Sequence, residues 1–285
     1  MEINLFDLEK LIDRSLREDI GTGDLTTNSI VAPDATTYGY IMAKEGGVVA
    51  GLQIAEMIFC RFDPAFEFKA LVRDGDRVRP GSILAEIAGR ARAILAGERL
   101  ALNFLQHMSG IATRTAGLVS LVEGSPARIV DTRKTTPGLR AIEKYAVKAG
   151  GGYNHRFGLY DGVLIKDNHI KVAGGIGPAV KSARLGSPHT VRIEVEVEDL
   201  AGVREALSAG ADIIMLDNMA PEEMQEAVKL IAGRVLVEAS GGISEGNIRA
   251  AAAAGVDLIS VGALTHSVKS LDICLDLHMV KTVRN

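Results

Sequence analysis

The sequence predicts an α/β protein in which a C-terminal barrel-like β/α domain of about six or seven strands packs on an N-terminal α/β sandwich domain. From about residue 128 onward, short β-branched runs alternate with helical segments that end in glycine, as in a parallel sheet covered by helices. The first 125 residues carry a turn-rich hairpin and a long apolar helix instead. We predict a sandwich domain with a dimer-forming helix over residues 1–110, joined by 267–285, and a barrel domain over 111–266.

Composition limits the kinds of partner. The chain has 285 residues, of which 47% are hydrophobic, and this is enough for a substantial core. Its net charge of −4 argues against a nucleic-acid or acidic-membrane footprint, and no apolar run reaches membrane-spanning length. Cys60 and Cys274 lie far apart without a disulfide spacing pattern, and the opening segment lacks the features of a signal peptide. We expect a cytoplasmic protein.

The sequence of the N-terminal part predicts the following elements, given in chain order. Residues 1–19 form an amphipathic helix, 38–51 are strand-like, 54–62 are helical, and 72–89 form a turn-rich hairpin. The GTGD stretch at 21–24 is a poor candidate for a nucleotide loop because it follows a helix. A long apolar helix follows. Its polar residues are spaced by about four, which places them in one stripe along the helix. The stripe consists of Arg99, Asn103, Gln106 and His107.

Six strand-like runs follow, and each is separated from the next by a helical segment or a turn. The runs are ARIVDT, DGVLIKD, VRIEVEV, ADIIMLD, RVLVEAS and VDLISVG. The helical segments include GLRAIEKYAVKAG, GPAVKSARLG, DLAGVREALSAG, PEEMQEAVKLIAG and EGNIRAAAAAG. Repeated units with short links favour a β/α barrel over an open doubly wound sheet.

In a β/α barrel the chemistry lies at the carboxyl ends of the strands, and polar residues do follow all six runs. In chain order these are Arg133 and Lys134; Lys166, Asp167 and Asn168; Glu196; Asp217 and Asn218; Ser240, Gly241 and Gly242; and Gly262. Cations come first, carboxylates next, and small residues with accessible backbone amides last. This order suits a ligand with several anionic groups, one of them held through a metal.

Cations gather in one segment of this slightly acidic chain. Residues 128–171 contain nine Lys or Arg and four Asp or Glu, a local charge of +5. Arg140, Lys144 and Lys148 are spaced four apart, which predicts a solvated helical face. The cations Arg133, Arg156 and Lys166 lie instead at turns and strand ends, and together they suit a ligand with more than one carboxylate.

Glu196 and Asp217 form a carboxylate pair on neighbouring strand ends. Without a Cys or His cluster nearby, the pair suits Mg²⁺, although salt bridges to the nearby lysines are an equal alternative. Glu194 and Glu198 share the strand face of Glu196, so one of the three carboxylates is expected to point inward. The residues alone leave open whether His155 and His169 bind a ligand or serve the structure. The glycines after the last two strands suit a phosphate.

Four segments carry a family resemblance that spans essentially the whole chain. They are EDIGTGDLTT, GERLALNFLQHMSGIAT, DTRKTTPGLRAIEKYAVKAGGGYNHRFGLYDGVLIKDNH and EVEVE, and they resemble quinolinate phosphoribosyltransferases. The resemblance implies transfer of a phosphoribosyl group from 5-phosphoribosyl diphosphate (PRPP) to the ring nitrogen of quinolinate. Diphosphate and CO₂ are released, and nicotinate mononucleotide is formed for NAD synthesis. It also implies Mg²⁺ as cofactor and a homodimer with shared active sites, with a higher oligomer left open.

The resemblance also implies a role for each site residue. Quinolinate would be bound by Arg133, His155, Arg156 and Lys166, with Arg99 reaching in from a second subunit. PRPP and its phosphates would meet Lys134, Ser240, Gly241 and Gly262, and Mg²⁺ would be held by Glu196 and Asp217. The catalytic group would comprise Lys134, Lys166, Glu196 and Asp217.

Three other interpretations compete with this one. A related barrel phosphoribosyltransferase of molybdenum operons shares the RKTTPG and HR elements, but the NHR and IKDNH strings favour the quinolinate family. A barrel lyase would use Lys134 or Lys166 as a Schiff base. A carrier function would rest on the DGDRVRPGSILAEIAG hairpin with Lys44 modified, but shared hairpin geometry explains that pattern better.

Overall fold

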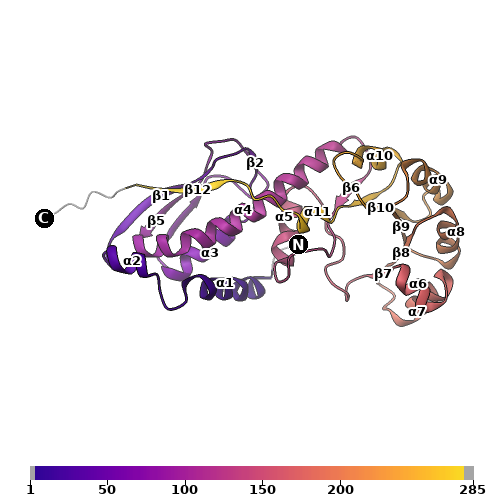
Figure 1. The fold of residues 1–285 in the computed structure, drawn as a ribbon, viewed down its shortest axis with the longest axis horizontal. Helices are drawn as coiled ribbons and strands as arrows, with labels where there is room; N and C mark the ends of the chain where they lie inside the picture. Colours follow the sequence, from indigo (N-terminus) through magenta and orange to yellow (C-terminus); the bar gives the residue numbers. More distant parts are fainter. Residues whose placement is uncertain (1–3, 279–285) are drawn as a thin grey trace. The chain divides into compact units, whose positions relative to one another are not determined.

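The computed structural model describes residues 4–278, and the chain divides into two compact units (Figure 1). Among these residues, the first unit contains 4–114, 137–151 and 267–278, and the second contains 115–136 and 152–266. The last part of the predicted C-terminal segment, 279–285, lies outside the described residues. Within 4–278, no helix combines the length and the apolar character needed to cross a membrane.

The first unit is built on an antiparallel sheet of order β12-β1-β5-β3, with a separate β2-β4 pair. Its helices are α1 (Leu5–Ile20), α2 (Leu25–Ile30), α3 (Leu52–Phe62), α4 (Ala91–Leu121), which continues into the second unit, and α5 (Arg140–Ala149). Its strands are β1 (Thr36–Ala43), β2 (Gly47–Val48), β3 (Glu67–Ala70), β4 (Arg77–Val78), β5 (Ile83–Arg90) and β12 (Ile273–His278). Strand β12 therefore completes a sheet that begins near the amino terminus.

Apolar faces of α3 and α4 form the core of this unit. Phe59 and Phe66 stack with ring centroids 4.8 Å apart, and Leu105 and Met108 on α4 are fully buried. The GTGD stretch ends α1 and begins α2, where Asp24 accepts a hydrogen bond from the backbone N–H of Thr27 at 2.9 Å. That stretch serves as a helix cap.

The solvated face predicted for Arg140, Lys144 and Lys148 is wrong for Lys144. Its side chain is fully buried, as is that of the neighbouring Glu143, whereas Lys148 is exposed. The buried positions of α5 are 142, 143, 144, 146 and 147, which cover most of its circumference. Because the helix is enclosed on several sides, charged residues spaced by four do not define a single solvent-exposed face.

The second unit contains a six-stranded parallel sheet of order β6-β11-β10-β9-β8-β7, so the predicted barrel-like β/α fold is confirmed. Its strands are β6 (Arg128–Val130), β7 (Val163–Ile165), β8 (Ile193–Val197), β9 (Ile213–Asp217), β10 (Leu236–Ser240) and β11 (Leu258–Ser260). Its helices are α6 (Asp167–Ala173), α7 (Ile176–Gly186), α8 (Leu200–Ala209), α9 (Pro221–Ile231), α10 (Ile248–Ala253) and α11 (Ala263–His266). Figure 1 shows α6 to α10 along the outer side of the curved sheet.

The curvature leaves β6 and β7 as the two edges of the sheet. An isolated bridge between Val130 and Tyr153 extends the β6 edge, with the backbone N–H of Tyr153 donating to the carbonyl of Ile129 at 2.8 Å. Because all six strands run parallel, their carboxyl ends meet at one edge of the sheet. The functional side chains predicted for the strand ends are therefore brought to a common place.

Candidate active site

A pocket of about 560 Å³ lies at the carboxyl ends of the strands in the second unit. It is lined by nine of the eleven predicted site residues: Arg133, Lys134, His155, Arg156, Lys166, Glu196, Asp217, Ser240 and Gly241. The other two do not line it. Arg99 is exposed on α4 in the first unit, and Gly262 lies behind Lys134.

The DTRKTTPG loop follows β6, and two threonine hydroxyls form hydrogen bonds with its backbone at Lys134. The hydroxyl of Thr132 accepts a hydrogen bond from the N–H of Lys134 at 3.0 Å, and the hydroxyl of Thr265 donates to the Lys134 carbonyl at 2.8 Å. A Cβ at Gly262 would lie 3.1 Å from Cδ of Lys134, so a side chain there would push the lysine away. Gly262 thus leaves room for Lys134.

Arg156 and Arg133 bring two guanidinium groups to the same pocket. Burial lowers the pKa of Arg156, and the positive charge of Arg133 lowers it further, while Glu194 and Asp161 oppose the shift. Arg156 also donates through Nη1 to the carbonyl of Gly162 at 2.9 Å. Arginine remains charged despite such a shift, so the crowded cations are relieved when an anion binds between them.

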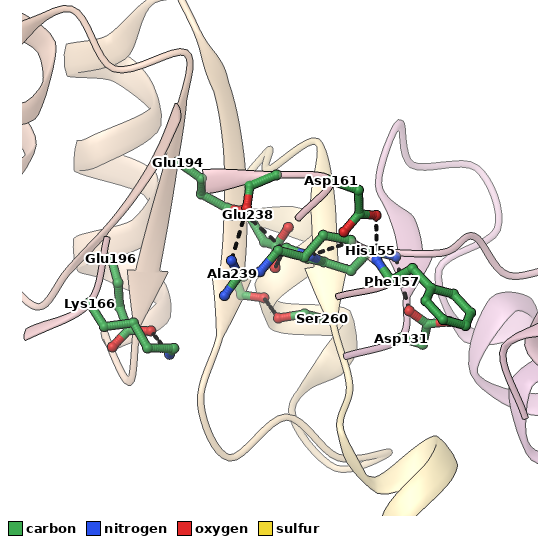
Figure 2. A network of polar contacts seen from close by, with 12 residues as sticks. Asp131, His155, Phe157, Asp161, Lys166, Glu194, Glu196, Glu238, Ala239 and Ser260 are labelled. Carbon is green, nitrogen blue, oxygen red and sulfur yellow. Dashed lines mark hydrogen bonds and ion pairs between the residues drawn. The ribbon is translucent and has the colours of Figure 1, made fainter. Parts of the chain in front are cut away.

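Lys166 and Glu196 form an ion pair within the pocket, shown in Figure 2. Of the two alternatives for Glu196, a magnesium ligand or a salt bridge to a lysine, this structure contains the salt bridge. Asp217, on the neighbouring strand β9, accepts a hydrogen bond from Nδ2 of Asn218 at 2.9 Å. Both carboxylates line the pocket and offer only oxygen ligands, the donor set that Mg²⁺ requires.

A glycine turn follows β10 on the other side of the pocket. Gly241 has φ +86°, and a Cβ at this position would overlap the side chain of Asn218. The turn is held by Asn247, whose Nδ2 donates to the carbonyl of Gly242 at 3.0 Å and whose Oδ1 accepts from the N–H of Ser244 at 2.8 Å. Accessible amides in such a turn suit an anionic oxygen.

Beneath the strand ends lies a buried cluster that the sequence interpretation largely missed. Nε2 of His155 is 3.0 Å from Oε2 of Glu194 and 3.7 Å from Oε1 of Glu238 (Figure 2). Both carboxylates are at least 95% buried, and within residues 4–278 one oxygen of each, Oε1, has no hydrogen-bond partner. Burial, followed by the charge of Glu194, raises the pKa of Glu238 to about 8.

The tautomer of His155 follows from its neighbours. Its Nδ1 accepts a hydrogen bond from the backbone N–H of Arg156 at 2.7 Å, and a backbone N–H can only donate. The ring proton therefore lies on Nε2, which donates to Glu194. Asp131, fully buried after β6, accepts from the N–H of His155 at 2.9 Å and from Nδ2 of Asn154 at 2.6 Å. These contacts fix the histidine at the bottom of the pocket.

The period of two along each strand could have revealed this cluster. Glu194 precedes Glu196 by two residues, and Glu238 precedes Ser240 by two, so each lies one layer below a residue at the strand end. Of Glu194, Glu196 and Glu198, which share one strand face, Glu194 is the residue that is buried. His169 has a structural role, because its Nδ1 accepts from the N–H of Lys166 at 2.9 Å in the first turn of α6.

Comparisons with known proteins agree with this arrangement. Family models described as the C-terminal and N-terminal domains of quinolinate phosphoribosyl transferase match residues 111–276 and 24–109. A probable nicotinate-nucleotide pyrophosphorylase (carboxylating) of Bacillus subtilis is 48% identical, covering 96% of this chain and 95% of the relative. A mitochondrial quinolinate phosphoribosyltransferase (decarboxylating) of Nicotiana tabacum is 42% identical, covering 95% and 82% respectively.

A solved structure is similarly close. That of the nicotinate-nucleotide pyrophosphorylase from Francisella tularensis has a TM-score of 0.94 and 40% identity, covering 97% of this chain and 98% of the other. The fold and the matched domains define a phosphoribosyltransferase built on a barrel-like β/α sheet. More narrowly, the chain belongs to the quinolinate phosphoribosyltransferase family, as the sequence resemblance predicted.

Proposed function

We propose that this protein transfers the phosphoribosyl group of PRPP to the ring nitrogen of quinolinate, with release of diphosphate and CO₂. The product would be nicotinate mononucleotide, a precursor in de novo NAD biosynthesis. The observation that carries the proposal is the composition of one pocket. Four cations, Arg133, Lys134, Arg156 and Lys166, line it together with the carboxylates of Glu196 and Asp217 and the turn at Gly241.

The cationic side suits quinolinate because that pyridine carries two adjacent carboxylates. Arg133 and Arg156 present planar forks that match carboxylates, whereas Lys166 offers a point charge. Lys166 is paired with Glu196 in this structure, so binding a substrate carboxylate requires the lysine to exchange or share its partner. The exchange would leave Glu196 available to the ribosyl side.

The opposite side suits PRPP and Mg²⁺. Glu196 and Asp217 would hold the ion, which keeps water and phosphate oxygens among its ligands, and Mg²⁺ would supply charge neutralisation of the diphosphate. Lys134 would contact the phosphate groups, and the amides near Ser240 and Gly241 would bind the 5-phosphate. Gly262 would act indirectly, by leaving the space that Lys134 occupies.

The order of events follows from charge. Loss of diphosphate leaves an oxocarbenium-like ribosyl carbon, which the positioned pyridine nitrogen attacks. The alkylated nitrogen is cationic, so the bond from the adjacent ring carbon to its carboxylate can break and leave the electron pair beside a positive charge. Arg and Lys contacts to the second carboxylate determine which carboxylate is lost.

We further propose a homodimer that acts in the cytoplasm, with Arg99 completing the site of the second subunit. Arg99 is exposed on α4, and Cys60 and Cys274 are both free thiols, as expected in a reducing compartment. Mixing inactive Arg99→Ala and Lys166→Ala proteins under subunit exchange tests the sharing. Hybrid dimers would contain one intact site, so activity should recover to about a quarter of the wild-type value. No recovery despite verified exchange would contradict a shared site.

The activity itself is tested by mixing the pure protein with quinolinate, PRPP and Mg²⁺ and measuring nicotinate mononucleotide and CO₂. Nicotinate serves as the competing acceptor, and omission of Mg²⁺ with added EDTA should abolish turnover. Product from nicotinate but not from quinolinate would overturn the proposed substrate.

A further inference from the structure

The proposed reaction does not yet account for the source of one proton. When CO₂ leaves the ring, the carbon beside the alkylated nitrogen keeps the electron pair of the broken bond. Nicotinate mononucleotide carries hydrogen at that carbon, so one proton must be supplied for each turnover. This inference rests on the proposed function, and it asks which group of the protein provides that proton.

Glu238 borders the pocket that is proposed to hold quinolinate. It lines the same pocket as Arg133, Arg156 and Lys166, although only 1% of its surface is exposed. Its Oε1 has no hydrogen-bond partner within residues 4–278, so this oxygen is left for a ligand or a proton. Strand β10 holds the side chain one layer below Ser240, at the bottom of the pocket.

We propose that Glu238 is the catalytic acid that protonates the ring carbon from which CO₂ departs. In this step the carbon–carboxylate bond breaks, its electron pair stays on the ring carbon, and CO₂ leaves. The O–H bond of Glu238 then breaks, a C–H bond forms, and the carboxylate of Glu238 remains. Nicotinate mononucleotide and ionised Glu238 are the products of the step, and no further reactant is required.

The charges around Glu238 favour a protonated side chain. The titratable groups that face it are Glu194 on β8, Asp131 after β6 and His155 on the loop before β7. His155 opposes the rise in the pKa of Glu238, but it does not outweigh burial and the charge of Glu194. Burial and repulsion from Glu194 therefore raise the pKa of Glu238, and the acid keeps its proton near neutral pH.

A bound metal ion is a less suitable occupant of this cluster. The nitrogen and oxygen atoms of His155, Glu194 and Glu238 are close enough to hold an ion, all within 4.8 Å of one another. However, a metal needs the lone pair of Nε2, and that nitrogen carries the ring proton because Nδ1 accepts from a backbone N–H. A proton held by Glu238 itself needs no change of that tautomer.

A second cavity offers a route for restoring the proton. This lower pocket, of about 510 Å³, is lined by Arg128, Val163, Ile213 and Leu258, the first residues of four strands. It shares His155, Arg156 and Glu238 with the upper pocket, so Glu238 borders both. Water entering from the amino ends of the strands can return a proton to Glu238 while product still fills the upper pocket.

The decisive variant is Glu238→Gln, which keeps the size of the side chain but cannot donate a proton to carbon. Quinolinate binding, measured by calorimetry, should stay within about threefold, while kcat falls by about 10²-fold or more. In a single turnover, the ribosylated dicarboxylate should accumulate, because an unprotonated ring carbon can recapture CO₂. Mass spectrometry distinguishes that intermediate from product. In the wild type, kcat should fall as pH rises above about 8, and this limb should be absent in the variant.

Glu194→Gln is the matched second variant. It removes the like charge next to Glu238 but keeps a side chain of the same shape, so the alkaline limb of kcat should move to lower pH. The proposal is overturned by Glu238→Gln with kcat within threefold of wild type, or by no accumulated intermediate. If Glu238→Gln fails to fold, an unmoved limb in Glu194→Gln overturns it. Wild-type protein that does not convert quinolinate at all would instead refute the proposed function.

Discussion

The rim and the floor of the pocket handle charge in opposite ways. The rim, comprising Arg133, Lys134, Lys166, Glu196 and Asp217, pairs its charges or leaves them partly exposed, and its lysine–glutamate pair can open when a ligand arrives. The floor, comprising His155, Glu194 and Glu238, buries two carboxylates beside a neutral histidine. Exchangeable partners suit binding, whereas a fixed excess of negative charge suits the storage of a proton.

The largest effect on activity is expected from removing a cation of the rim. Lys166→Ala or Arg133→Ala removes a cation that binds the substrate carboxylates, and kcat/KM should fall by about 10²- to 10³-fold with little change in melting temperature. Lys171→Ala is the matched control, because Lys171 is exposed on α6 and forms an ion pair with Asp167 at 2.9 Å. Near-normal kinetics in both rim variants would contradict the assignment of the pocket.

Breaking the support of the floor should have a smaller effect that appears in stability. In Asp131→Asn, an amide N–H₂ must face either the N–H of His155 or the amide of Asn154, both of which donate. The free energy of unfolding should fall by about 1–3 kcal/mol, the cost of a buried donor without an acceptor. Urea unfolding measures the change, with the exposed Glu198→Gln as control. Equal stability of the two variants would show that these hydrogen bonds are not needed.

The pH dependence of stability offers a further way to sharpen the comparison. The pKa of Glu238 is raised in the folded state, so the folded protein binds more protons than the unfolded chain between about pH 4.5 and 8. Stability from this group is present below the unfolded pKa and is lost as pH rises towards the folded pKa. The loss is at most about 1.4 kcal/mol per pH unit. Glu238→Gln should lack this slope in urea titrations; an unchanged slope would mean that Glu238 is ionised throughout.

The sequence predicted the strands and the rim because both follow from position. Runs rich in Val, Ile and Leu became β6 to β11, and parallel strands bring their carboxyl ends together whatever their detailed packing. Thus Arg133, Lys166 and Asp217 could be placed in one pocket without knowing a single contact. The ion pair between Lys166 and Glu196 was one of two alternatives, and only side-chain geometry distinguished them.

The floor was harder to predict because its charges lie inside apolar runs. In VRIEVEV two glutamates alternate with valine and reveal the period of two, whereas RVLVEAS contains a single glutamate, Glu238, and shows no such alternation. Lys144 is a related case, because its regular helical spacing predicts a solvent-exposed side chain and the structure buries it. In both places burial depends on how many neighbours surround an element, and local sequence does not contain that information.

The pairing of β12 with β1 has a consequence for how the protein is made. Tyr38 is opposite His278 and Ala43 is opposite Ile273, so the sheet of the first unit joins segments more than 200 residues apart. During synthesis, β1 emerges well before β12 and waits with an open backbone edge until residues 273–278 have left the ribosome. Chains that terminate before residue 273 would keep that edge open, and we expect them to be captured by chaperones or to aggregate.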